Sequence, residues 1–296
     1  MFLRIVEILL PIFAIVAVGF VYGRKHRPEM AVANRINLDV FLPALVFATL
    51  AGKSYALKED GLLALAALLA LLLPGLLAWP VARFIGVSPR TFVPPMMFNN
   101  SGNIGLPVAF LAWGEGAMPV AVVFFLAANL LHFSLGIRML DPQAKLLGLW
   151  RIPVLAAALA GLAVGLLKLS VWPPVMMAIK LLGDISIPLL LFALGVRMTN
   201  ISLSDWKLSF FAAAFRPLAG MICAWCVIVL LGLTGRDAAM LLVFGGLPPA
   251  VLNFMFAERY HQEPARVASM VLLGNLVALV VLPVALVLSA AYFPFG

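Results

Sequence analysis

Apolar residues form ten long stretches along the chain, and short polar segments separate them. Each stretch is close to the roughly 20 residues that a helix needs to cross the hydrocarbon layer of a bilayer. The pattern therefore predicts an all-α polytopic membrane protein with ten transmembrane helices. These helices are expected at residues 4–23, 34–52, 61–82, 91–112, 117–138, 151–168, 173–198, 207–231, 237–257 and 265–290.

Composition and charge fit a membrane protein. The chain is 65% hydrophobic and 11% charged, whereas soluble domains average roughly 45–50% apolar and about 25% charged residues. The net charge of +8 would suggest a nucleic-acid partner in a soluble protein, but most Lys and Arg residues here fall in short loops. Thirteen lie on one side of the predicted membrane and six on the other. Because Lys and Arg mark cytoplasmic loops, we expect both termini on the outer (periplasmic) side of a bacterial cytoplasmic (inner) membrane, and no nucleic-acid partner.

Several short patterns of the first half return in the second half in the same order. Asp39, Pro43, Phe47 and Ala48 return as Asp184, Pro188, Phe192 and Ala193, at an offset of 145 residues. Other landmarks correspond in the same way: Pro11, Gly19 and Gly23 to Pro153, Gly161 and Gly165, and Arg90, Phe98 and Asn129 to Arg236, Phe244 and Asn275. The order predicts two five-helix copies, residues 1–138 and 151–296, joined by a short cytoplasmic link at 139–150. Because five is odd, the second copy enters the membrane upside down, which makes an inverted repeat.

The fourth and ninth stretches are interrupted at corresponding positions by polar residues, glycines and prolines. Proline and glycine open the helix backbone, and free backbone groups cannot face lipid. The second half of each broken helix would present a partially positive N-terminus, which favours an anion, and the carbonyls that end the first halves could hold a cation or a proton donor. Ordinary kinked helices are the alternative. The predicted substrate-binding residues are Asn99, Asn100, Ser101, Asn103, Pro107, Gly246, Pro248, Pro249, Asn253 and Arg216.

Other polar residues inside the predicted helices need a partner or a function. Arg216 could pair with a substrate carboxylate or with Asp184, or form a purely structural ion pair. Asp39 and Asp184 could take up a proton in a coupled cycle or serve helix packing. Asn129 and Asn275 occupy matching places and could hydrogen-bond between helices or line the crossing.

Five motifs carry a family resemblance: NRINLDVFLPALVF, NNSGNIGLPVAF, GDISIPLLLFALG, PPAVLNFMFAERY and VASMVLLGNLVAL. They resemble the auxin efflux carrier family, which includes plant PIN carriers and many bacterial permeases. The resemblance implies that broken helices 4 and 9 cross at the substrate site. It also implies a mobile transport unit (helices 3–5 and 8–10), a scaffold (helices 1, 2, 6 and 7) and a homodimer through the scaffold. The long central loop of many plant members is absent, which weakens auxin as substrate, and bacterial relatives resemble carriers of malonate and malate.

The predicted function is secondary active transport of a small organic anion, such as a mono- or dicarboxylate, by alternating access. Coupling to H+ or Na+, or no coupling, stays open, and no cofactor or metal site is expected. The alternatives are an uncoupled anion channel, a carrier for an auxin-like aromatic acid, and an intramembrane enzyme. We find no H-E-x-x-H, no G-x-S-x-G and no aspartate-rich metal motif, so an enzyme is not expected. There is no Walker A motif either, so ATP-driven transport would need another subunit.

Overall fold

The computed structural model describes residues 2–52, 57–144, 152–199 and 205–293. Regular structure within these residues is helical, and the only β-type pairing among them is an isolated antiparallel bridge between Asn99 and Pro249. Part of the predicted link, residues 145–150, lies outside the described residues. So do three of the Lys and Arg residues that were counted on the two sides of the membrane, namely Lys53, Lys145 and Arg151.

Helices occur in all ten apolar stretches, in several cases as consecutive pieces. The first half contains α1 (Phe2–His26), α2 (Ala31–Ile36), η1 (Asn37–Phe41), α3 (Leu42–Ala51), α4 (Leu57–Phe84), α5 (Pro89–Met97), η2 (Ser101–Gly105), α6 (Leu106–Trp113), η3 (Glu115–Ala117), α7 (Met118–Leu131), η4 (His132–Gly136) and α8 (Ile137–Leu140). The second half contains α9 (Pro153–Leu166), α10 (Pro173–Asp184), α11 (Ser186–Arg197), α12 (Trp206–Leu231), α13 (Gly235–Gly245), α14 (Leu252–Arg259) and α15 (Pro264–Tyr292).

Seven helical stretches of the described chain are long and apolar enough to cross a membrane. The helix α9 is a shorter apolar helix, and the fourth and ninth predicted stretches are each split into two helices. The protein is therefore an all-α polytopic membrane protein. Ten crossings and an inverted repeat stay predictions.

Proline, aspartate and glycine set several helix ends. Pro153 and Pro264 stand in the first turns of α9 and α15, where a missing N–H costs nothing. Asp205 caps α12 by accepting a hydrogen bond from the Leu208 backbone N–H, at 3.2 Å. Gly232 ends α12 in the left-handed conformation, with φ of 65°, which glycine adopts without strain.

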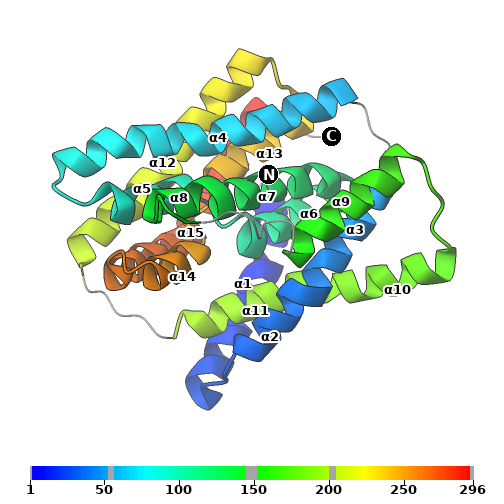
Figure 1. Ribbon diagram of the computed structural model, residues 1–296, viewed down its shortest axis with the longest axis horizontal. Helices are drawn as coiled ribbons and strands as arrows, with labels where there is room; N and C mark the ends of the chain where they lie inside the picture. Colours follow the sequence, from blue (N-terminus) through cyan, green and yellow to red (C-terminus); the bar gives the residue numbers. More distant parts are fainter. Residues whose placement is uncertain (1, 53–56, 145–151, 200–204, 294–296) are drawn as a thin grey trace.

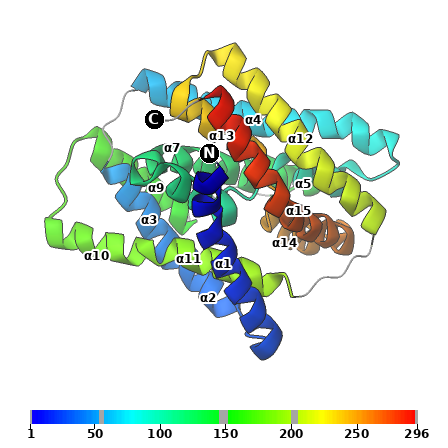
Figure 2. The ribbon, with the colours of Figure 1, turned by 180° about the vertical axis from the view of Figure 1, so that it is seen from behind.

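The helices form two groups that lie side by side. The helices α1, α3, α10 and α11 occupy the lower part of both views, and α4, α12 and α13 the upper part (Figures 1 and 2). In the first group α1 packs on α11 and α3 packs on α9. In the second group α12 packs on α4, α13 and α15.

Glycines allow the closest helix contacts of the first group. A Cβ atom at Gly19 of α1 would collide with the backbone carbonyl of Phe192 in α11. A Cβ atom at Gly161 of α9 would lie only 2.9 Å from the backbone carbonyl oxygen of Phe47 in α3. Small residues let membrane helices approach closely enough for backbone contacts, so these two pairs lock together inside the first group.

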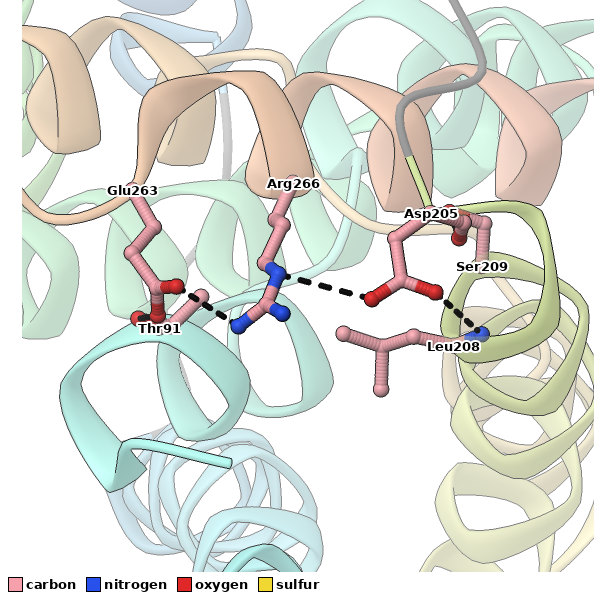
Figure 3. Close-up of polar contacts among 6 residues, drawn as sticks. All are labelled: Thr91, Asp205, Leu208, Ser209, Glu263 and Arg266. Atoms are coloured by element: carbon pink, nitrogen blue, oxygen red, sulfur yellow. Dashed lines mark hydrogen bonds and ion pairs between the residues drawn. The ribbon is translucent and has the colours of Figure 1, made fainter. Parts of the chain in front are cut away.

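A charged network ties three helix starts of the second group together. Figure 3 shows that Arg266 of α15 lies between Asp205 and Glu263. Its Nε atom is 3.4 Å from Asp205 Oδ2, and its Nη1 donates to Glu263 Oε1 at 2.6 Å. The Thr91 hydroxyl of α5 donates to Glu263 Oε2 at 2.6 Å. The network therefore joins the N-terminal ends of α5, α12 and α15.

Replacing Arg266 with glutamine should lower the melting temperature of the purified protein at low salt and have a smaller effect in 1 M salt. The three charged side chains are partly exposed, so we expect a loss of about 1 kcal/mol that added salt screens. Thermal unfolding at the two salt concentrations measures it. Arg83→Gln removes an exposed arginine with the same change of net charge and should have little effect. An equal loss in both variants would contradict the network's role.

Candidate functional site

The two interrupted helices meet at their breaks. Backbone hydrogen bonds run from Asn100 N–H to the Pro248 carbonyl oxygen, at 2.8 Å, and from Ala250 N–H to the Phe98 carbonyl oxygen, at 2.9 Å. They flank the bridge between Asn99 and Pro249. Two of the backbone N–H groups expected to be free at the breaks are therefore used to pair the breaks with each other.

Asparagine side chains donate hydrogen bonds to the backbone carbonyls beside this bridge. Asn99 Nδ2 donates to the Phe244 carbonyl in the last turn of α13, at 2.8 Å. Asn253 Nδ2 donates to the Phe98 carbonyl that follows α5, at 3.0 Å. Each break thus supplies an amide to a carbonyl of the other. Of the two occupants expected for these carbonyls, a cation or a proton donor, the structure has amide donors of the protein at Phe98 and Phe244. Buried carbonyls are paired with protein donors in this way in most proteins.

Asn275 of α15 holds both breaks from one side. Its Oδ1 accepts a hydrogen bond from Asn100 Nδ2 at 2.9 Å, and its Nδ2 donates to the Pro249 carbonyl at 3.2 Å and to the Val271 carbonyl at 2.7 Å. Asn129, at the matching sequence position, donates to Phe125 of its own helix at 2.8 Å. The two matching asparagines therefore make the same contact within their own helices, but only Asn275 bonds to the breaks.

A cavity of about 1060 Å³ lies beside the paired breaks. Its wall combines the first break with parts of α2, η1, α7, η4, α11, α14 and α15. Three π-helical turns of the described chain, η1, η2 and η4, all contribute to it. Such turns are rare and often lie at functional sites. The polar and charged lining residues are Asn34, Arg35, Asn37, Asp39, Asn99, Asn100, Ser101, Asn103, Asn129, His132, Arg197 and Asn275.

Two buried side-chain oxygens in this wall have no hydrogen-bond partner among the described residues. They are Asn37 Oδ1 and Asn99 Oδ1, on side chains that are 1% and 7% exposed. The Asn99 amide nitrogen already donates to Phe244, so its oxygen is free to accept. A buried acceptor without a partner costs free energy.

The structure does not bring Arg216 and Asp184 together. Arg216 of α12 is 0% exposed, and its Nη1 donates to the Gly245 carbonyl at the end of α13, at 3.0 Å. Asp184 ends α10 with an exposed side chain. The sequence suggested this ion pair because each residue lies inside an apolar stretch, but α10 packs on α3 in the first group and α12 packs on α4, α13 and α15 in the second. Neither residue lines the cavity.

Asp39 lies in the cavity wall as half of an exposed ion pair. Its Oδ2 is 3.6 Å from the Nε of Arg35, one helical turn earlier. Asp39 is thus compensated locally, which agrees with the structural reading of this residue.

The remaining predicted site residues shape the crossing without lining the cavity. Pro107 is buried in the first turn of α6. Gly246 and Pro248 are buried in the second break. Pro249 packs against α15 so closely that a Cβ atom at Gly274 would lie 2.6 Å from its Cδ.

Five polar or charged residues of the wall were not among the site residues predicted from the sequence: Asn34, Arg35, Asn37, His132 and Arg197. Arg197 counted only as a loop charge, because it follows the last apolar turn of its stretch. Asn37 stood inside the NRINLDV motif without a role of its own. The motif itself was the available signal, since it places four polar residues in a predicted membrane helix.

Comparisons with known proteins agree with a transport function. Residues 143–286, nearly half of the chain, match the family described as membrane transport protein. A stretch of 108 residues is 29% identical to the rice (Oryza sativa subsp. japonica) protein named "Probable auxin efflux carrier component 1c". This match covers 36% of the present chain and 18% of the rice protein, so the chain aligns with less than a fifth of that relative. These matches confirm the resemblance to the auxin efflux carrier family, and the bacterial type stays a prediction.

Proposed function

Because residues 143–286 match the membrane transport protein family, we propose that this chain is a secondary active transporter for a small organic anion. The observation that carries the proposal is a cavity with polar and charged side chains in its wall, beside the paired breaks of two interrupted helices. The substrate we propose is a mono- or dicarboxylate such as malonate or malate, moved across a bacterial cytoplasmic membrane. Coupling to H+ or Na+ is compatible with the same site.

Groups of the first break are suited to bind a carboxylate. Ser101 and Asn103 begin the π-helical turn that leads into α6, and both line the cavity. The start of a helix carries partial positive charge, and a hydroxyl and a side-chain amide can both donate hydrogen bonds. We therefore assign the carboxylate to the start of η2.

The shape of the cavity supports an inward-open state. The cavity extends from the breaks to Ala31 at the start of α2 and to Arg197 at the end of α11. Both positions belong to the side with the larger number of Lys and Arg residues, which is the predicted cytoplasmic side. Alternating access then requires the crossing to move so that the cavity closes on this side and opens on the other.

Two contacts support the inverted repeat on which this movement depends. In the proposed correspondence Gly19 matches Gly161 and Phe47 matches Phe192. The contact of Gly19 with the Phe192 carbonyl is then equivalent to the contact of Gly161 with the Phe47 carbonyl. We propose that the group locked by these contacts, helices 1, 2, 6 and 7, is the scaffold and the homodimer interface, and that helices 3–5 and 8–10 move.

An auxin-like aromatic acid is the second candidate substrate. Phe125, Phe133 and Phe254 line the cavity and offer apolar surface to an aromatic ring. Competition between malonate and indole-3-acetate for the same binding site distinguishes the two candidates.

Asn103→Ala tests the proposed function. Asn103 lines the cavity, is half-buried, and makes no side-chain hydrogen bond that holds the described fold together. We expect saturable uptake of labelled malonate into proteoliposomes to fall by about tenfold or more, the loss expected for one hydrogen bond to a charged group. The melting temperature should change little.

Gln143→Ala is the control, because Gln143 is exposed and lies outside the cavity. It should keep wild-type uptake. Flux that does not saturate in the wild-type protein would indicate a channel and contradict the proposal, as would chemical conversion of the substrate.

A further inference from the structure

Arg197 presents its side chain to the cavity from the last turn of α11. Leu190, Leu194 and Arg197 follow one another at helical spacing, and all three line the cavity. Residues three and four positions apart share one face of a helix. The same helix packs against the η2 turn, which carries Ser101 and Asn103. The cationic side chain thus shares the cavity with the groups that we assign to the carboxylate.

The cavity has an uncompensated positive charge at Arg197. Three of its lining residues carry full charges, Arg35, Asp39 and Arg197. Arg35 and Asp39 form an ion pair with each other. No carboxylate among the described residues forms an ion pair with Arg197. The net charge of the cavity wall is therefore positive, and it is carried by Arg197.

The position of Arg197 suits it to bind an anion. Its side chain is half-buried, so part of it is removed from water. Burying a charge costs free energy unless the charge is paired, and pairing with an anion would therefore be favourable here. A guanidinium presents donors in a fixed planar fork that matches a carboxylate. The described residues provide no carboxylate for this guanidinium, so a bound anionic ligand would supply one.

We propose that Arg197 binds the second carboxylate of a dicarboxylate whose first carboxylate is held at the start of η2, and that this contact makes the transporter prefer dianions to monoanions. The inference rests on the proposed function. It adds a residue that selects substrates by their charge. The Arg35–Asp39 pair, in the same cavity, has its charge satisfied within the protein and does not select.

Titration calorimetry on the purified full chain in zwitterionic nanodiscs tests the inference. The ligands are malonate, succinate and glutarate, with acetate and propionate as monocarboxylates. We expect the wild-type protein to bind at least one dicarboxylate more tightly than either monocarboxylate. Arg197→Gln should weaken that dicarboxylate by about tenfold or more, as expected for the loss of one charge-assisted contact. Affinity for monocarboxylates should change by less than about threefold.

Arg83→Gln is the matched control, because it makes the same change of net charge at an exposed arginine outside the cavity. It should leave the ratio of dicarboxylate to monocarboxylate affinity unchanged, and Arg197→Lys, which keeps the charge, should retain part of the preference. If Arg197→Gln has the wild-type ratio, or if both glutamine variants lower it equally, the inference is overturned while the proposed function stands. If the wild-type protein binds no carboxylate, both fail.

An anionic lipid headgroup could also supply an anion to Arg197. A second set of nanodiscs with phosphatidylglycerol separates the two sources. A melting temperature that rises with phosphatidylglycerol in the wild-type protein but not in Arg197→Gln, without any preference for dicarboxylates, would assign the residue to lipid and overturn the inference.

Discussion

Replacing Asn275 with alanine will abolish saturable uptake and lower the stability of the protein by about 2–4 kcal/mol. The side chain connects α15 to both breaks, through Asn100 Nδ2 and the carbonyl of Pro249. Alanine would leave a buried donor and a buried acceptor without partners, and each such group costs about 1–3 kcal/mol. The crossing would then lose its fixed geometry. Thermal unfolding and proteoliposome uptake measure the two effects.

Asn129→Ala is the control that the chain itself offers. Asn129 occupies the matching position in α7 and lines the same cavity, but its amide donates only to Phe125 of its own helix. This variant should lose less than about 1 kcal/mol and keep most of its uptake. Equal losses in the two variants would mean that each asparagine stabilises only its own helix and that the hydrogen bonds of Asn275 to the breaks contribute little.

The positions of the helices could be predicted because their signals are local. Long apolar runs mark the membrane helices, and Gly245, Gly246, Pro248 and Pro249 mark the second break without any knowledge of the fold. The same holds for the polar run of the first break, which starts at Asn99. The structure has helices in each predicted stretch and interruptions at both places.

The partners of polar side chains could not be predicted, because an apolar sequence does not say which way a membrane helix faces. Lipid and protein interior are equally apolar, so hydrophobic periodicity does not separate the lipid-facing side from the packed side. Asp184 and Arg216 illustrate this, since both lie in apolar stretches but one is exposed and the other is 0% exposed. Arg197 faces the cavity for reasons that only the packing of α11 reveals.

The π-helical turns could not be predicted from the sequence either. Such a turn inserts one residue into a helix without changing the length of the apolar run, and its cause lies in the contacts around it. Asn37, Leu38 and Asp39, all in the turn Asn37–Phe41, line the cavity.

Replacing Arg216 with methionine will weaken anion binding by roughly tenfold and leave the protein folded. Arg216 is fully buried next to the end of α13, and it donates one hydrogen bond to Gly245 while its Nε and Nη2 have no partner among the described residues. Burying such a charge is costly, and apolar replacements of buried charges are often neutral for stability. The charge itself adds positive potential near the crossing. A tenfold effect is about 1.4 kcal/mol, which two unit charges produce across about 12 Å at an effective dielectric constant of about 20.

Arg216→Lys separates the effect of charge from that of shape, because it keeps the positive charge and loses the planar guanidinium. We expect it to bind the anion nearly as tightly as the wild-type protein, while Arg216→Met binds it more weakly at the same melting temperature. Titration calorimetry with malonate and thermal unfolding give the two readouts. If lysine and methionine weaken binding equally, the charge of Arg216 does not strengthen anion binding. Its contribution then comes from the hydrogen bond to the end of α13.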